Sequence, residues 1–145
     1  MSAKDRLFAD YDGYHQNRRN KVCHFIGIPL IVATTIGLLL RWDFVTVGRF
    51  GVSAGDVVLL GATLFYAVIA PSLALPMLAA TAFLGALGRA LPPSWAVGLF
   101  VLGWIFQFVG HLGYEKKSPA FLKNAGHLLI GPLWVLEAAM GRGER

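Results

Sequence analysis

The sequence has few charged residues and almost no cysteine. Of its 145 residues, 14% are charged and 56% are hydrophobic, and the mean hydropathy is +0.59. Such a chain has too little polar surface for an ordinary water-soluble globule, so the composition predicts a membrane protein. The single cysteine, Cys23, excludes an intramolecular disulfide and a Cys-x-x-Cys motif, and its apolar setting is typical of a packed side chain.

Other signatures are missing as well. No glycine-rich phosphate-binding loop follows a strand pattern, and no internal repeat can be aligned, so neither an inverted-repeat transporter nor a solenoid is indicated. No basic stretch is interleaved with stacking aromatic residues, so no nucleic-acid partner is expected, and the net charge of +5 suits anionic lipid headgroups. The first 21 residues carry too many charges for a secretory signal.

Five apolar runs dominate the rest of the chain, at residues 22–40, 57–70, 73–87, 95–109 and 127–140. With the polar N-terminal segment they predict an all-α, multipass membrane helical bundle of four to five apolar helices plus an N-terminal juxtamembrane helix. We expect a single integral-membrane domain over residues 1–145. The second and third runs, separated at Pro71, predict a helical hairpin, and residues 89–94 predict a turn. Several runs hold only ~14–18 residues, which is short for a ~30 Å hydrocarbon core. The last run therefore either crosses the membrane or re-enters it on the same side.

Basic residues are distributed unevenly about these runs. If the amino terminus is cytoplasmic, the cytoplasmic segments collect eight of them: Lys4, Arg6, Arg18, Arg19, Lys21, Lys116, Lys117 and Lys123. The opposite side holds Arg41, Arg49 and Arg89, while the side of Arg142 and Arg145 depends on the last helix. This asymmetry predicts a cytoplasmic amino terminus. The alanine- and glycine-rich composition favours a bacterial inner membrane, with the endoplasmic reticulum as the eukaryotic alternative.

All the histidines of the chain lie beside the ends of apolar runs that this topology places on the cytoplasmic face. They are His15, His24, His111 and His127. Imidazole is the commonest side-chain metal ligand near neutral pH, and it suits iron, zinc, copper and nickel. The sequence therefore predicts one metal site at the cytoplasmic membrane interface. The alternative for each histidine is a solvated or hydrogen-bonded side chain without a metal.

Spacing refines this hypothesis. His111 and Glu115 are four residues apart and share a helical face, so Glu115 is either a ligand or the acceptor of a ligating histidine's free ring N–H. His15 and His24 are nine residues apart, about 180° around a straight helix, so they reach one metal only if the chain bends between them. Asn20 is a plausible place for that bend, because asparagine caps helices well. Otherwise each histidine contacts a different partner.

Two motifs resemble a known family. They are Tyr11-x-x-x-His15-x-x-x-x-Asn20-x-x-x-His24-x-x-Gly27-x-Pro29 and Gln107-x-x-Gly110-His111-x-x-Tyr114-Glu115-Lys116-x-x-Pro119-Ala120. Together with the segment from His127 to Glu137, they resemble the small multipass membrane 2-hydroxy fatty acid dioxygenases of α-oxidation. The likeness covers nearly the whole chain, although residues 57–87 match only in apolar character.

The resemblance implies an Fe(II)-dependent, dioxygen-consuming reaction that removes the carboxyl carbon of a 2-hydroxy fatty acid. It implies His15, His24, His111 and His127 as iron ligands, Glu115 as a ligand or as a group that orients one, and Tyr11 and Asn20 as catalytic-site residues that contact the ligands rather than the iron. Lys116, Lys117 or Arg18 would pair with the substrate carboxylate, while the acyl tail lies between helices among membrane lipid. The acyl-chain length and oligomeric state are left open.

Three other functions compete with this one. A haem or electron-transfer protein would use histidine pairs as axial ligands, and a metal-free scaffold or small transporter would use none. A zinc hydrolase would use the same ligand types, because imidazole serves zinc equally well. Tyr11 and Tyr14 are also typical of interfacial anchors, and Lys116 and Lys117 also fit the cytoplasmic charge bias alone.

Overall fold

A computed structural model describes residues 1–141, and Arg142 and Arg145 of the charge count lie outside the described residues. The chain divides into two compact units, which are described separately. The first unit comprises Met1–Pro29 with Leu102–Arg145, and the second comprises Leu30–Val101. The expectation of one integral-membrane domain stays a prediction.

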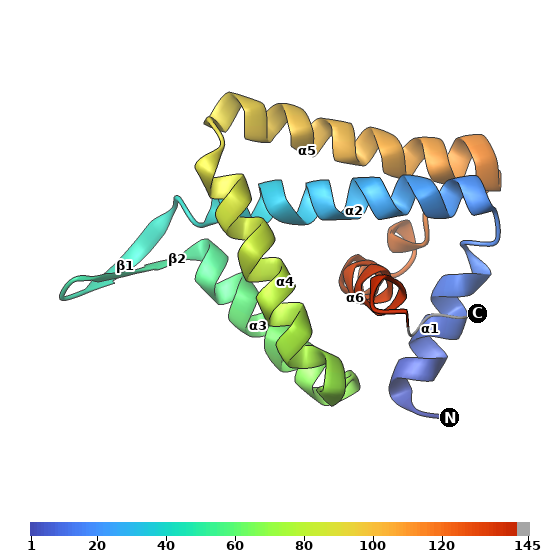
Figure 1. Ribbon diagram of the computed structural model, residues 1–145, viewed down its shortest axis with the longest axis horizontal. Helices are drawn as coiled ribbons and strands as arrows, with labels where there is room; N and C mark the ends of the chain where they lie inside the picture. Colours follow the sequence, from blue (N-terminus) through green and yellow to red (C-terminus); the bar gives the residue numbers. More distant parts are fainter. Residues whose placement is uncertain (142–145) are drawn as a thin grey trace. The chain divides into compact units, whose positions relative to one another are not determined.

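Helices account for most of the described residues (Figure 1). The elements in chain order are α1 (Ala3–Gly13), α2 (Arg18–Leu39), β1 (Asp43–Val47), β2 (Phe50–Ser53), α3 (Ala54–Ile69), α4 (Pro71–Ala90), α5 (Pro93–Phe108), the π-helix η1 (Val109–Glu115), the 3₁₀ turn η2 (Ala120–Leu122) and α6 (His127–Ala139). The predicted all-α membrane architecture is confirmed. Within residues 1–141, three helical segments are long and apolar enough to cross a membrane, namely α2, α4 and the continuous stretch Pro93–Glu115.

The shorter apolar helices are α3 and α6, with 16 and 13 residues. At about 1.5 Å per residue they span less than a ~30 Å hydrocarbon core. The predicted hairpin is confirmed, because α3 and α4 pack against each other on either side of Ala70. The N-terminal juxtamembrane helix is confirmed as α1, which starts at a capping box between Ser2 and Asp5.

The predicted helix boundary at Asn20 is wrong. Helix α2 begins at Arg18 and continues through Pro29, so Asn20 lies inside its first turn. The chain bends instead at residues 14–17, where Asn17 Oδ1 accepts a hydrogen bond from the Arg19 backbone N–H at 2.8 Å. Asn17 can reach this free N–H because it precedes the helix, whereas a residue within the first turn cannot cap it.

In the first unit, polar side chains tie α1 to α6. The Trp134 Nε1–H donates to Asp12 Oδ1 at 2.8 Å, and Lys4 forms an ion pair with the buried Glu137. Gly131 lets the helices approach closely, because a Cβ there would lie 3.0 Å from the Tyr11 hydroxyl oxygen. These contacts fix α1, which carries little apolar surface of its own, beside the apolar helix α6.

In the second unit, small residues bring helices together. A Cβ on Gly88 of α4 would overlap the carbonyl oxygen of Ala33, so the two backbones touch there. Arg41 donates from Nη2 to the carbonyl oxygen of Leu91 at 2.6 Å, which satisfies a carbonyl group just after the end of α4. The antiparallel hairpin β1–β2 also belongs to this unit and was not predicted from the sequence.

Candidate metal centre

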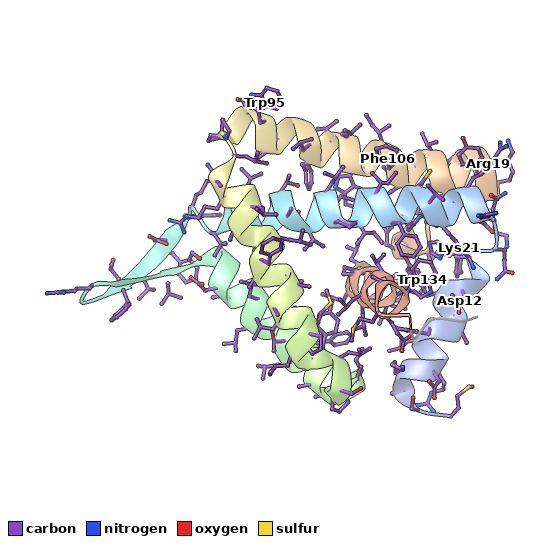
Figure 2. The ribbon with its side chains drawn as sticks, viewed as in Figure 1. Asp12, Arg19, Lys21, Trp95, Phe106 and Trp134 are labelled. Atoms are coloured by element: carbon purple, nitrogen blue, oxygen red, sulfur yellow. The ribbon has the colours of Figure 1, made fainter. Side chains whose placement is uncertain are left out.

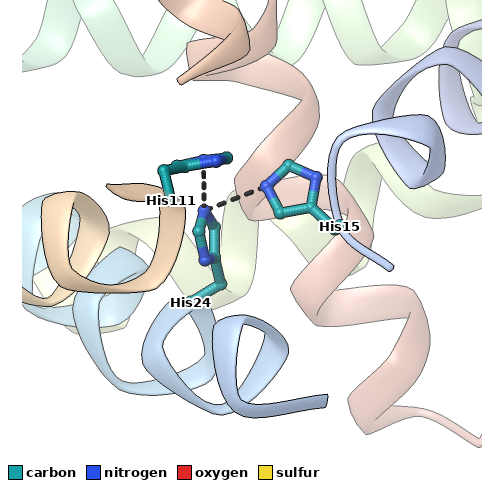
Figure 3. Close-up of side chains that lie close together, drawn as sticks. All are labelled: His15, His24 and His111. Carbon is teal, nitrogen blue, oxygen red and sulfur yellow. Dashed lines mark hydrogen bonds between the residues drawn. The ribbon is translucent and has the colours of Figure 1, made fainter. Parts of the chain in front are cut away.

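Three histidines from separate segments meet inside the first unit (Figure 3). His15 comes from the bend after α1, His24 from α2 and His111 from η1. The Nε2 atom of His24 lies 3.0 Å from Nε2 of His15 and 3.1 Å from Nε2 of His111. All three side chains are buried, with 1–2% of their surface exposed. The structure thus brings together three of the predicted ligands.

Backbone carbonyl groups fix the tautomers of two of these rings. Nδ1 of His15 lies 2.6 Å from the carbonyl oxygen of Tyr11, and Nδ1 of His24 lies 2.9 Å from that of Asn20. A carbonyl oxygen can only accept, so each Nδ1 must carry the hydrogen. Each neutral ring then presents an unprotonated Nε2 with its lone pair directed toward the cluster. Histidines that bind metals typically have this arrangement, with the other ring N–H held by a carbonyl group.

Two lone pairs facing each other at 3.0 Å repel unless a cation lies between them. A proton is disfavoured there, because burial, with the neighbouring His24 adding to it, lowers the pKa of His15 to about 2. A metal ion carries the required positive charge and accepts both lone pairs. The cluster could therefore hold a metal ion.

Two of the distances between ring nitrogens also fit a metal. At metal–nitrogen bonds of about 2.1 Å, adjacent ligand atoms are separated by about 3.0–3.4 Å. Two of the Nε2 pairs have this separation, and one ligand atom from each ring lies within 4.8 Å of the others. Neutral imidazole suits iron, zinc, copper and nickel.

The π-helix η1 positions His111. It follows α5 directly and contains Gly110 and Gly113, and π-helical turns frequently occur at functional sites. A Cβ on Gly110 would overlap Oδ1 of Asn20, so only glycine lets η1 approach α2 here. Nδ1 of His111 is buried and has no hydrogen-bond partner among residues 1–141. This third ring is therefore held by packing rather than by a carbonyl group.

Glu115, at the end of η1, binds the start of α2. Its carboxylate accepts hydrogen bonds from the backbone N–H groups of Gln16 at 2.9 Å and Asn17 at 2.8 Å, and from Asn20 Nδ2 at 3.1 Å. A carboxylate is favoured at a helix N-terminus, where backbone N–H groups lack partners. Glu115 thus joins the two segments that carry His24 and His111, and it hydrogen-bonds to no histidine ring within residues 1–141.

Tyr11 and Asn20 also contact the cluster. The Tyr11 ring stacks on the His15 ring with centroids 3.9 Å apart and planes inclined by 14°. Asn20 is fully buried, and besides its bond to Glu115 it supplies the backbone carbonyl that orients His24. Both residues therefore orient ligand rings in the structure. Their part in the reaction stays a prediction.

His127 lies outside the three-histidine cluster. Its Nε2 atom is 2.8 Å from Oδ2 of Asp10, and its buried Nδ1 has no hydrogen-bond partner in the described part of the chain. The Tyr11 ring lies beside it, with centroids 5.7 Å apart. A role for His127 as a fourth ligand stays a prediction. The sequence analysis did not identify Asp10 as a partner of His127. Its only sequence signal is its position on the charged N-terminal helix, one helical turn before Tyr14.

The predicted carboxylate-binding residues are exposed. Arg18, Lys116 and Lys117 all lie on the surface, and Lys117 Nζ donates to the Gly13 carbonyl oxygen at 3.4 Å. Lys116 ends η1 in the left-handed conformation, with φ of 59°. Their role in substrate binding also stays a prediction.

The fold and the cluster define a membrane protein with a buried three-histidine site that can hold a metal ion. Comparison with known proteins then gives the family. Residues 1–143 match the family described as "2-hydroxy-palmitic acid dioxygenase Mpo1-like", and the chain belongs to this Mpo1-like family. The chain is similar to 2-hydroxy-palmitic acid dioxygenase MPO1 of Saccharomyces cerevisiae, with 32% identity over 135 residues, which cover 87% of this chain and 73% of the yeast protein. No solved structure matches the chain.

Proposed function

We propose that this protein is an Fe(II)-dependent dioxygenase that shortens 2-hydroxy fatty acids by one carbon. The observation that carries the proposal is the pair of tautomer-fixed Nε2 atoms of His15 and His24, 3.0 Å apart in a buried site. Membership of the Mpo1-like family and the name of the yeast relative support the substrate class.

Iron is the metal that the reaction favours. A three-imidazole site accepts several first-row metals, but zinc has no redox chemistry and cannot serve an oxygen-consuming cleavage. Bound iron would supply the site for dioxygen activation. We therefore assign Fe(II) as the cofactor, with His15, His24 and His111 as its ligands and His127 as the candidate for a fourth.

The protein's own residues would hold these ligands rigid. The carbonyl groups of Tyr11 and Asn20 keep the Nδ1 hydrogens of His15 and His24, so both Nε2 atoms stay available. Glu115 keeps η1 against α2, which maintains the 3.1 Å approach of His111 to His24. The stacked Tyr11 ring excludes water from one face of His15.

The site would lie at the cytoplasmic membrane interface. Two of its ligands, His24 and His111, come from the first turns of α2 and from the end of the segment Pro93–Glu115, which are ends of two candidate membrane-crossing segments. The excess of basic residues beside these ends supports a cytoplasmic orientation. A lipid substrate could then keep its acyl chain in hydrocarbon while its headgroup meets the site. In a bacterium the membrane would be the inner membrane.

The test is metal analysis combined with oxygen uptake. Detergent-purified protein is loaded anaerobically with Fe(II), the bound iron is quantified, and oxygen consumption is followed after addition of 2-hydroxypalmitate. We expect about one iron per chain, substrate-dependent oxygen uptake and a product one carbon shorter. Iron binding without oxygen uptake would refute the substrate, and protein that binds zinc but never iron would refute the redox function.

A further inference from the structure

A cavity of about 170 Å³ lies in the first unit, between α1, α2 and α6. Its lining residues come from those three helices and are Phe8, Asp12, Lys21, Phe25, Trp134, Glu137 and Ala138. Since one water molecule takes about 30 Å³ of liquid, the cavity has room for a group of about five or six non-hydrogen atoms. That is the size of a 2-hydroxy carboxylate with its first chain carbons.

The lining combines apolar walls with three charged groups. Figure 2 labels three of the lining residues, Asp12, Lys21 and Trp134. Two of these groups already have partners, because Glu137 pairs with Lys4 and Asp12 accepts from Trp134. The third belongs to Lys21, a half-buried residue whose ammonium group has no hydrogen-bond or ion-pair partner within residues 1–141. A lysine that lines a small cavity and forms no ion pair is suited to bind an anionic ligand.

The cavity also borders the histidine cluster. The Trp134 ring, which forms part of its wall, lies with its centroid 6.1 Å from that of His15 and 5.5 Å from that of Tyr11. Lys21 precedes His24 by three residues on α2, so the two side chains emerge one helical turn apart. An anion held by Lys21 would therefore be placed next to the cluster.

We propose that this cavity binds the carboxylate end of the substrate, with the Lys21 ammonium group as its anion-binding partner and the rings of Phe8, Phe25 and Trp134 enclosing the first chain carbons. This inference rests on the proposed function, and it deepens that function by naming the pocket and the specificity-determining residue. Lys21 replaces the exposed residues Lys116, Lys117 and Arg18 as the first choice for carboxylate recognition, because only Lys21 among these four lines the cavity.

The test compares an acid with its neutral ester. Iron-loaded full-length protein in nanodiscs of neutral lipid is kept anaerobic, so no turnover occurs, and dissociation constants are measured for 2-hydroxypalmitate and its methyl ester. In the wild type the acid binds more tightly than the ester. Lys21→Met retains the length of the side chain and removes its charge, so it should weaken binding of the acid about 10- to 100-fold and leave the ester unchanged. Lys21→Arg should retain most of the preference for the acid.

Lys123→Met is the matched control, because Lys123 is an exposed lysine outside the cavity. Unchanged binding of the ester shows that a variant has folded. Partitioning of the ligands into the lipid does not affect the comparison, because all variants are measured in nanodiscs of the same lipid. A Lys21→Met variant that keeps the wild-type preference for the acid, while the wild type binds and consumes 2-hydroxypalmitate, would overturn only this inference. A wild type that neither binds the acid nor consumes oxygen with it would overturn the proposed function as well.

Discussion

The two units differ in where they bury polar groups. Of the nine buried polar or charged side chains among residues 1–141, seven belong to the first unit: His15, Asn20, His24, Gln107, His111, His127 and Glu137. The second unit buries only Thr34 and Ser53. Burying a polar group costs free energy unless it is hydrogen-bonded, and perturbed titratable groups cluster at functional sites, so this concentration is consistent with the proposed metal site in the first unit.

The second unit is held together by different means. Gly88 allows backbone contact with Ala33, and the hydroxyl group of Thr34 donates a hydrogen bond to the carbonyl oxygen of Leu30 at 2.7 Å. Small residues at helix contacts and hydroxyl groups bonded within their own helix are typical of helices that pack in a membrane. We therefore expect substitutions in the first unit to affect metal binding and substitutions in the second unit to affect helix packing.

The largest effect should follow His24→Ala. His24 is the central ring of the cluster, with its Nε2 near both other Nε2 atoms. We expect loss of bound iron and a drop in oxygen consumption of more than about 100-fold. Thr34→Val is the matched control, because Thr34 is buried on the same helix but belongs to the second unit. Equal iron contents in the two variants would contradict the assignment of chemistry to the first unit.

Glu115→Gln should have the next largest effect. The amide keeps the shape of the side chain but loses the negative charge that binds the start of α2. We expect iron affinity, measured by competition with a chelator, to fall about 10- to 100-fold. A purely structural role would lower the melting temperature alone, so unchanged iron affinity at a reduced melting temperature would disprove the positioning role.

His127→Ala should weaken iron binding less than His24→Ala. The Nε2 atom of His127 is engaged by Asp10 and lies outside the cluster, so we expect near-stoichiometric iron and an affinity lowered by less than about tenfold. Asp10→Asn provides the comparison, since it alters the same pair without removing the ring. Complete loss of iron in His127→Ala alone would instead support the fourth ligand that the sequence predicted.

Gly88→Ala should have the smallest effect on metal binding while it destabilises the second unit. The added methyl group overlaps the Ala33 carbonyl oxygen, and relief of such overpacking costs about 1–3 kcal/mol. We expect a lower melting temperature with about the wild-type iron content per folded chain. Loss of iron at temperatures where the variant is still helical would show that the two units are energetically coupled.

Much of the fold and part of the site could be predicted from the sequence. The apolar runs predicted the membrane helices, and the residues around Pro71 and Pro92 predicted the breaks, because both signals depend on local composition. The hairpin β1–β2 was missed, since two short strands depend on pairing with each other. The bend was placed at Asn20 instead of residues 14–17, because the side chain that ends up capping a helix depends on the path of the chain.

The sequence by itself determined that the protein is apolar enough for a membrane and that its histidines lie beside the helix ends. The carbonyl groups that fix the tautomers of His15 and His24 are local in sequence, because each precedes its histidine by four residues, but the structure was needed to show these contacts. Only the tertiary structure decided that His111 joins them while His127 pairs with Asp10. Those contacts link residues 87 and 117 positions apart, which only the packing of η1 on α2 and of α6 on α1 brings within bonding distance.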